Sequence, residues 1–342
     1  MRRTSVWLYP FTCAYSLVTR SRNFLYDRGI IAVHRSRLPV ISIGNISCGG
    51  NAKTPLCSYL SQILLERGYR PVVLSRGYGG TVCGPRLVLG WDSYKRVGDE
   101  ACMLVGQGAT VVIARDRVMG CRFIEEQALG DVIILDDGFQ HRRLHRDLDI
   151  VSLNVSSPQA ISDLLAARLL PTGRLREDRD RALARADALV FSYRKRLPHQ
   201  PTLDARLQAL APRGKPVYSS ALEVQGLFSL CDEQRRLEPA AKIVAFCAIA
   251  APEGFFETLS GMGYEVMERR TFGDHHPISV GDLDGMRRRF PGVPLVCTAK
   301  DAVKIDPSWG QNIYVLQVKI RVWPEADFLV QIMSILNARR IP

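Results

Sequence analysis

Residues 40–54 read VISIGNISCGGNAKT, and this stretch decides the fold of the chain. Its first residues, Val40–Ile43, form a β-branched run that predicts a buried strand. A turn of small residues, Ser47–Thr54, follows and ends in Lys-Thr. Apolar positions at helical spacing then predict a helix over 55–67. A strand, a glycine-rich turn, a Lys-Thr pair and a helix occur in this order in loops that bind phosphate.

Phosphate binding explains the residue types of this loop. Backbone N–H groups of small residues can approach phosphate oxygens, while Lys53 would reach the terminal phosphates and Thr54 the Mg²⁺ ion. Ser47 and Ala52 stand where the G-x-x-x-x-G-K-[ST] pattern has glycine, and alanine costs about 1 kcal/mol wherever φ must be positive. An ordinary Gly-Gly turn before a helix is the alternative. We predict that a nucleotide contacts the whole loop, Ser47, Cys48, Gly49, Gly50, Asn51, Ala52, Lys53 and Thr54.

An acidic pair follows another apolar strand. Residues 132–135 read VIIL and lead directly into Asp136 and Asp137. Carboxylates at the end of a buried strand can hold Mg²⁺ beside a phosphate loop. Two solvated acids in a turn are the alternative, and the phosphate loop argues against it.

Short apolar strands alternate with helices through the rest of the chain. Strands that are apolar on both faces predict a parallel sheet sandwiched by helices, so we expect an α/β fold of the P-loop NTPase type. The last strand of this group is predicted at Pro216–Ser219, and a second, smaller α/β domain begins near Lys242. The predicted division is a membrane-associating segment at 1–20, a nucleotide-binding domain at 21–220, a linker at 221–238 and a smaller α/β domain with a C-terminal helix at 239–342.

The charge of the chain favours an anionic partner. The formal net charge is +12, and residues 1–40 contain seven arginines against one acid, Asp27. A membrane surface or a phosphorylated substrate fits this excess, with a solvated basic surface as the alternative. Nucleic acid is disfavoured, because no helix-turn-helix, RRM or zinc motif accompanies the charge. The sequence gives no sign of an obligate protein partner.

The nine cysteines contain no CxxC pair. An odd number without framework spacing indicates reduced thiols in a cytosol-like compartment. The absence of paired Cys/His spacing in the sequence also disfavours a structural zinc site.

The N-terminal segment Thr4–Thr19 is apolar and aromatic. Its sixteen residues carry no charge and are interrupted by Pro10. They are fewer than the roughly 20 residues that a spanning helix needs. Arginines flank the segment on both sides, which favours an element lying on an anionic leaflet. A buried N-terminal helix is the alternative.

Eight stretches of the sequence together share the pattern of one family. They are Ile43–Asn45, Gly49–Pro55, Leu74–Gly80, Val97–Glu100, Asp136–His141, Leu170–Glu177, Asp274–His276 and Thr298–Lys304. The motifs SRGYGG and DDGFQH are highly specific, and the eight stretches extend over most of the chain. The sequence therefore resembles the tetraacyldisaccharide 4'-kinases of lipid A synthesis.

The resemblance implies transfer of the γ-phosphate of ATP to the 4'-hydroxyl of a tetraacyldisaccharide 1-phosphate, which forms lipid IVA. It also implies Mg²⁺ as a cofactor and work at the cytoplasmic face of the bacterial inner membrane. By position, Asp99 would be the catalytic base and His275 its partner, brought together by a hinge between the domains. The implied metal ligands are Thr54, Glu100, Asp137 and Gln140.

Three arginines on loops near this face are candidates for binding the lipid's anomeric phosphate, which needs a cationic partner. They are Arg76, Arg174 and Arg176, and solvated surface charges are the alternative.

The sequence departs from the family pattern at three places, Ala52, Ala299 and the Ala248-Ile249-Ala250 run. The residues that would carry the chemistry are all retained, which favours an active enzyme. A P-loop kinase or NTPase that acts on another glycolipid acceptor is the competing interpretation.

Overall fold

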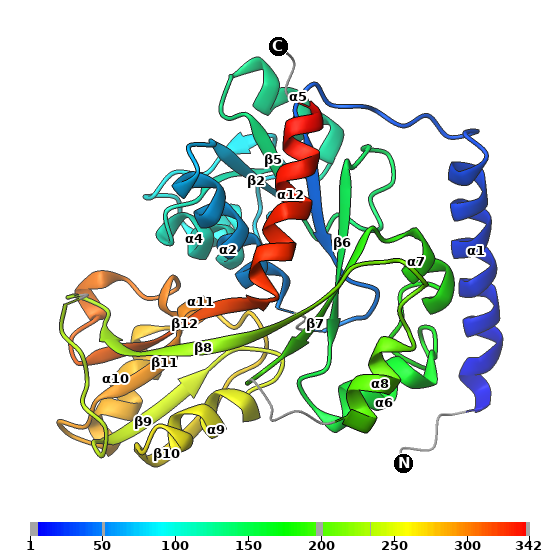
Figure 1. The fold of residues 1–342 in the computed structure, drawn as a ribbon. Coiled ribbons are helices and arrows are strands. Elements are labelled where there is room, and N and C mark those ends of the chain that lie inside the picture. The colour runs from blue at the N-terminus through cyan, green and yellow to red at the C-terminus, as the bar shows by residue number, and fades with distance from the viewer. Residues whose placement is uncertain (1–5, 50–51, 196–200, 233, 340–342) are drawn as a thin grey trace.

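The computed structural model describes residues 6–49, 52–195, 201–232 and 234–339 (Figure 1). A mixed sheet of twelve strands runs through these residues in the order β10-β9-β11-β12-β8-β7-β6-β1-β5-β2-β4-β3. The strands are β1 Val40–Gly44, β2 Pro71–Ser75, β3 Arg86–Leu87, β4 Thr110–Ile113, β5 Val132–Asp136, β6 Leu148–Asn154, β7 Ala188–Tyr193, β8 Val217–Ser229, β9 Lys242–Cys247, β10 Glu265–Thr271, β11 Leu295–Thr298 and β12 Ile313–Trp323.

Helices follow most of the strands, and short polar caps set where several of them begin. The Asp116 carboxylate accepts the N–H of Val118 at the start of α5, and Ser279 and Asp282 form a capping box on α10. The helices are α1 Tyr9–Asp27, α2 Lys53–Glu66, α3 Tyr94–Val97, α4 Asp99–Gly106, α5 Arg117–Glu126, α6 Pro158–Ala166, α7 Arg179–Arg185, α8 Pro201–Gln208, α9 Glu253–Gly261, α10 Val280–Arg289, α11 Ala299–Ala302 and α12 Glu325–Arg339.

The larger half of the sheet, β1–β7, is covered by helices on both faces. Neighbouring residues of β1 show this, because Ile41 packs into the core under α2, α4 and α12, whereas Val40 packs against α5. A strand with a core on each side must be apolar at every position. The parallel strands β7-β6-β1-β5-β2-β4, sandwiched in this way, confirm the predicted fold class.

The smaller half, β9–β12, has a core on each face of its own. Leu283 and Met286 of α10 belong to one core, and Phe255 and Leu259 of α9 belong to the other. This half is the smaller α/β unit that the sequence predicts.

The two halves share one long strand, β8. It runs parallel to β7 from Val217 and pairs antiparallel with β12 as far as Ser229. The apolar pattern predicts a strand here only over Pro216–Ser219, because the exposed Glu223 and Val224 interrupt it. Residues 221–229 of the predicted linker are therefore part of the sheet, and the halves are joined by a strand rather than by a loop.

The N-terminal helix α1 stands along one side of the larger half (Figure 1). The Tyr15 hydroxyl donates a hydrogen bond of 2.7 Å to the carbonyl of Arg176, and Arg20 pairs with Asp178 at 3.0 Å. Thr19 is its one buried residue, so α1 is not the buried helix that was the alternative expectation. Within the described ranges, no helix combines the length and hydropathy that crossing a bilayer requires.

Ala52 precedes α2 with a left-handed backbone. Its φ is 52° and its ψ is 21°, a conformation in which the β-carbon is crowded. The sequence predicts strain at residue 52 if its φ is positive, and its φ is positive in the structure.

Replacement of Ala52 by glycine should raise the free energy of unfolding by about 0.5–1 kcal/mol, measured by urea denaturation. Relief of left-handed strain, about 1–2 kcal/mol, exceeds the extra unfolded-state entropy of glycine. The matched control is Ala182→Gly inside α7, which should lower the free energy of unfolding by about 1 kcal/mol. Similar losses in both variants would contradict strain at residue 52.

Candidate functional site

The predicted site residues meet at the carboxyl ends of β1, β5 and β2, where open parallel sheets bind ligands. β1 leads into the phosphate loop, β5 ends at Asp136, and β2 is followed by Arg76. α4, which begins at Asp99, contacts α2 at the same edge. One edge of the sheet therefore gathers the loop, the acids and the candidate base.

The phosphate loop is anchored to a second segment of the chain. The N–H of Cys48 donates to the carbonyl of Arg174, and the N–H of Arg176 donates to the carbonyl of Ile46, each at 2.8 Å. The side chain of Arg174 lies over the loop, with Nη1 4.0 Å from the place that a β-carbon on Gly49 would occupy. The loop thus carries a guanidinium group above it.

Lys53 and Thr54 open the first turn of α2, where the helix N-terminus favours an anion. Lys53 Nζ lies 3.5 Å from Asp137 Oδ1. Ser47 pairs with Leu175 in an isolated bridge. The predicted contacts Gly50 and Asn51 lie outside the described residues.

Asp137 is held between two cations. Its carboxylate faces Lys53 and accepts hydrogen bonds of 3.1 and 3.0 Å from Arg176 Nη1. Burial raises the pKa of Asp137, but the charges of Lys53 and Arg176 outweigh burial and leave that pKa below its ordinary value. Arg176, a candidate for the lipid phosphate, is thus paired with an acid here. The ionised Asp137 carboxylate is a suitable ligand for Mg²⁺.

Asp136 has the opposite character, although it is the next residue. It is buried, accepts a hydrogen bond of 3.2 Å from the Ser75 hydroxyl, and lies 3.7 Å from the thiol of Cys57. Burial, reinforced by the charge of Glu100, raises the pKa of Asp136 to about 6. The sequence alone does not separate the roles of the two adjacent acids, because their environments differ only in the fold.

Gln140 has both ends of its amide engaged. Its Nε2 donates to the carbonyl of Asn45 at 2.7 Å and to Glu177 at 3.1 Å, while Oε1 accepts from Arg176 at 3.3 Å. Glu100 presents its carboxylate to Lys300 at 3.7 Å. Glu100 and Asp137 are the carboxylates of the predicted metal set, and Mg²⁺ in kinases commonly uses one or two carboxylates plus phosphate oxygens.

A separate group of residues of metal-binding types is formed by His34, which precedes β1 in sequence, and two residues of α5. The ligand atoms of His34, Cys121 and Glu125 all fall within 4.8 Å of one another. Glu125 Oε1 already accepts hydrogen bonds from the Ser36 hydroxyl at 2.7 Å and the Arg37 N–H at 2.8 Å. This group lies at the amino end of β1 and is no part of the site.

Asp99 and His275 meet, as predicted. His275 Nδ1 is 2.8 Å from Asp99 Oδ2, and the Asp99 side chain is 4% exposed. His275 has a left-handed φ of 61°, and its N–H donates to the carbonyl of Ala248 at 3.2 Å. The contact joins the two halves of the sheet and is already made, so the expected hinge closure is not needed to form it.

Two lysines beside this pair were given no role by sequence analysis. Lys300 Nζ lies 3.3 Å from His275 Nε2, and Lys304 Nζ lies 3.7 Å from Asp99 Oδ2. An ammonium group can only donate and a carboxylate can only accept, so Nδ1 of His275 carries the proton toward Asp99 and Nε2 is the acceptor. Both lysines belong to the family-like stretch Thr298–Lys304, the one signal that could have found them.

The remaining arginines occupy the rim of the site. Arg76 is exposed at the end of β2. Arg174 Nε lies 3.7 Å from Asp163, and its side chain is largely exposed. Both guanidinium groups are accessible to an anionic ligand.

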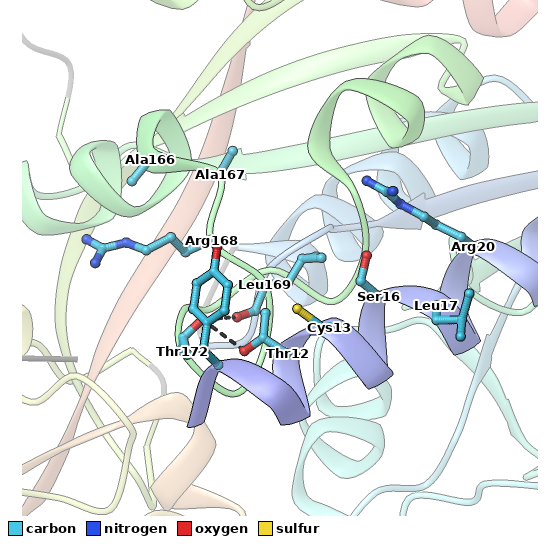
Figure 2. Close-up of a pocket in the computed structure, with 11 residues that line it drawn as sticks. Thr12, Cys13, Ser16, Leu17, Arg20, Ala166, Ala167, Arg168, Leu169 and Thr172 are labelled. Atoms are coloured by element: carbon cyan, nitrogen blue, oxygen red, sulfur yellow. Dashed lines mark hydrogen bonds between the residues drawn. The ribbon is translucent and has the colours of Figure 1, made fainter. Parts of the chain in front are cut away.

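A pocket of about 670 Å³ lies between α1 and residues 166–172 (Figure 2). Leu17, Leu169 and small side chains line it, together with arginines from both walls. A hydrogen bond of 3.0 Å between Thr12 and Thr172 connects the two walls. Thr172, in the wall of the pocket, is followed in sequence by Arg174 and Arg176, whose backbones anchor the phosphate loop. A short segment of chain therefore links the pocket to the loop.

Known proteins resemble this chain over nearly all of its length. Residues 4–337 match the family described as tetraacyldisaccharide-1-phosphate 4'-kinase. A tetraacyldisaccharide 4'-kinase of Chlorobium luteolum is 38% identical over 327 residues, covering 90% of this chain and 89% of that protein. A protein of the same description from Aeromonas hydrophila is 37% identical over 302 residues, covering 87% and 83%.

One solved structure resembles both halves of the fold. It is LpxK from Aquifex aeolicus, described as an apo form in complex with ATP. That chain is 30% identical in sequence and superposes with a TM-score of 0.77, covering 96% of this chain and 98% of its own.

Replacement of Asp136 by asparagine should change how stability depends on pH. A carboxyl group with a folded pKa of about 6, against about 3.9 when unfolded, stabilises the fold below pH 4 and loses that contribution as pH rises through 6. The stability of wild type relative to Asp136→Asn should therefore fall by about 2 kcal/mol between pH 4 and 7, measured by urea unfolding in a chelator.

Asp137→Asn is the matched control. The pKa of Asp137 is lowered, so its contribution is present above the unfolded pKa and is lost as pH falls through the folded value. Its difference from wild type should have the opposite sign, and the same sign for both variants would contradict the assigned environments.

Proposed function

This chain belongs to the tetraacyldisaccharide-1-phosphate 4'-kinase family, and on that premise we propose how its residues carry the reaction. The enzyme transfers the γ-phosphate of ATP to the 4'-hydroxyl of a tetraacyldisaccharide 1-phosphate and forms lipid IVA in lipid A synthesis. ATP is the phosphate donor, and Mg²⁺ accompanies it.

The 2.8 Å contact between Asp99 and His275 carries the assignment of the catalytic pair. Asp99 takes the proton of the 4'-hydroxyl while the hydroxyl oxygen bonds to the γ-phosphorus. The bond between the γ-phosphorus and the β–γ bridging oxygen breaks, and ADP leaves. His275 orients the Asp99 carboxylate and shares the charge that develops as the proton moves.

The donor side of the site supplies positioning and positive charge, which phosphoryl transfer requires above all. The loop from Ser47 to Thr54 holds the phosphates, with Lys53 at their terminal end. Thr54, Glu100, Asp137 and Gln140 would hold Mg²⁺, which would neutralise charge on the transferring phosphoryl group. The pairing of Asp137 with Lys53 supports this assignment.

The acceptor side is assigned to the arginines of the rim and to the pocket of Figure 2. Arg76, Arg174 and Arg176 bind the anomeric phosphate of the lipid, since guanidinium groups match phosphate oxygens in charge and geometry. The apolar walls that Leu17 and Leu169 contribute suit acyl chains.

The N-terminal helix is the proposed contact with the cytoplasmic face of the bacterial inner membrane. Large apolar side chains of α1 and of the turn before it face solvent, and arginines of the same region suit an anionic leaflet. These exposed side chains are Trp7, Tyr9, Phe11, Leu17, Val18 and Phe24.

We retain the division of the chain as part of the proposal. Residues 1–20 associate with the membrane, 21–220 bind the nucleotide, and 239–342 form the smaller unit that contributes His275. The connection over 221–238 begins in β8, which pairs with strands of both units.

Purified protein with Mg-ATP and the tetraacyldisaccharide 1-phosphate should form the 4'-phosphorylated product. Asp99→Ala should lower kcat by about 10²- to 10⁴-fold, because the base is lost. Lys53→Ala should instead weaken ATP binding as well as turnover. Radiolabelled phosphate transfer followed by chromatography measures both.

The exposed Lys319 supplies the control for general loss of charge, and Lys319→Ala should leave transfer intact. Transfer to a different glycolipid but not to the tetraacyldisaccharide would replace the acceptor assignment. Full activity of Asp99→Ala would remove Asp99 as the base.

Truncation of the exposed face of α1 should weaken binding to vesicles of anionic phospholipid. The triple variant Trp7→Ala, Phe11→Ala and Leu17→Ala loses apolar area that a leaflet would bury, so vesicle affinity should fall at least about tenfold in cosedimentation. The matched control is Trp91→Ala with Val330→Ala, which removes exposed apolar side chains elsewhere. Equal affinity of the triple variant and wild type would refute the membrane contact.

A further inference from the structure

A buried ion pair lies directly behind the contact between Asp99 and His275. Lys304 Nζ and Asp301 Oδ1 are 3.0 Å apart, and both side chains are completely buried. Desolvating two such charges costs about as much as their attraction returns, so a buried pair is weak evidence for a stabilising role. The contacts of its two ends indicate a different role.

The acidic end of the pair reaches the backbone of His275 through one residue, Ala248. Asp301 Oδ2 accepts hydrogen bonds from the Thr298 hydroxyl at 2.7 Å and from the N–H of Ala248 at 3.1 Å. The carbonyl of Ala248 accepts the N–H of His275 at 3.2 Å. Asp301 therefore ties the ends of β9 and β11 together and fixes Ala248, which holds the left-handed His275 in place.

The basic end of the pair reaches Asp99. Lys304 Nζ lies 3.7 Å from Asp99 Oδ2, the same oxygen that faces His275 Nδ1 at 2.8 Å. Lys304 projects from the smaller half, whereas Asp99 begins α4 in the larger half. One fully buried ammonium group thus faces two buried carboxylates, one from each half.

We propose that Asp301 and Lys304 are positioning residues for the catalytic pair: Asp301 sets His275 through Ala248, and Lys304 sets the Asp99 carboxylate. This inference rests on the proposed roles of Asp99 and His275. Lys300 differs from Lys304, because it is 20% exposed and contacts the outer nitrogen of His275.

The test compares Asp301→Asn, Lys304→Met and the double variant. Each single substitution leaves a buried charge without its partner, so the melting temperature should fall. The double substitution removes both charges and should recover much of that loss. Its kcat should nevertheless stay about tenfold to a hundredfold below wild type, because the catalytic pair is misplaced, while KM for Mg-ATP stays unchanged.

A spectroscopic signature tests the positioning without turnover. The hydrogen-bonded imidazole N–H of His275, identified by its absence in His275→Ala, should give a downfield proton resonance in wild type. This resonance should broaden or disappear in the double variant, because the Nδ1–H then exchanges with water.

The matched control is a buried ion pair at the amino end of the central strand β6. Arg146 and Asp149 lie 2.6 Å apart and are almost fully buried. Arg146→Met with Asp149→Asn should leave kcat and the His275 resonance as in wild type.

Wild-type kcat and an unchanged His275 resonance in the Asp301/Lys304 double variant would overturn the inference and leave the catalytic pair in place. Retained turnover by Asp99→Ala would overturn the proposed role of Asp99 and this inference with it. The two failures are therefore distinguishable.

Discussion

The antiparallel pairing of β8 with β12 is the constraint on which the rest of the structure depends. It joins two α/β halves edge to edge, so that twelve strands form one sheet. Loops at the ends of strands in both halves then meet where Asp99 contacts His275. His275 reaches Asp99 only because this shared ladder fixes the separation of the halves. Two rigid units joined by a flexible loop would have to find that geometry anew in every catalytic cycle.

Within this frame, local charge decides what each acid can do. Asp136 and Asp137 are neighbours in sequence, yet burial outweighs the nearby cations for Asp136, whereas Asp137 lies between Lys53 and Arg176. Consecutive side chains along a strand point in opposite directions, so the two carboxylates meet different neighbours. The left-handed φ of Asp137, 50°, turns the chain out of β5 and brings its carboxylate to the cationic side.

Periodicity predicted the parallel sheet and its helical layers, because both depend on local pattern and on the order of strands. The meeting of Asp99 with His275 was predicted from the resemblance to the kinase family, since no local pattern pairs residues so far apart in sequence. The full length of β8 was not predicted, because Glu223 and Val224 interrupt its apolar run and their pairing partners are distant in sequence. The roles of Lys300 and Lys304 could not be predicted for a similar reason. What a buried ammonium group does depends on which carboxylate lies next to it, and tertiary contacts decide that.

The anchoring of α1 has a consequence for where the enzyme works. The Tyr15 hydroxyl of α1 donates to the carbonyl of Arg176, and the N–H of the same residue donates to the carbonyl of Ile46, which directly precedes the phosphate loop. In the proposed membrane contact, a lipid leaflet under α1 and a nucleotide in the loop would therefore act on the same short segment. Linked equilibria are reciprocal, so whatever one occupant gains from the other is returned in equal measure. Such a kinase would act as an interfacial enzyme. Its affinity for the nucleotide would depend on whether it is bound to the membrane surface that carries its acceptor.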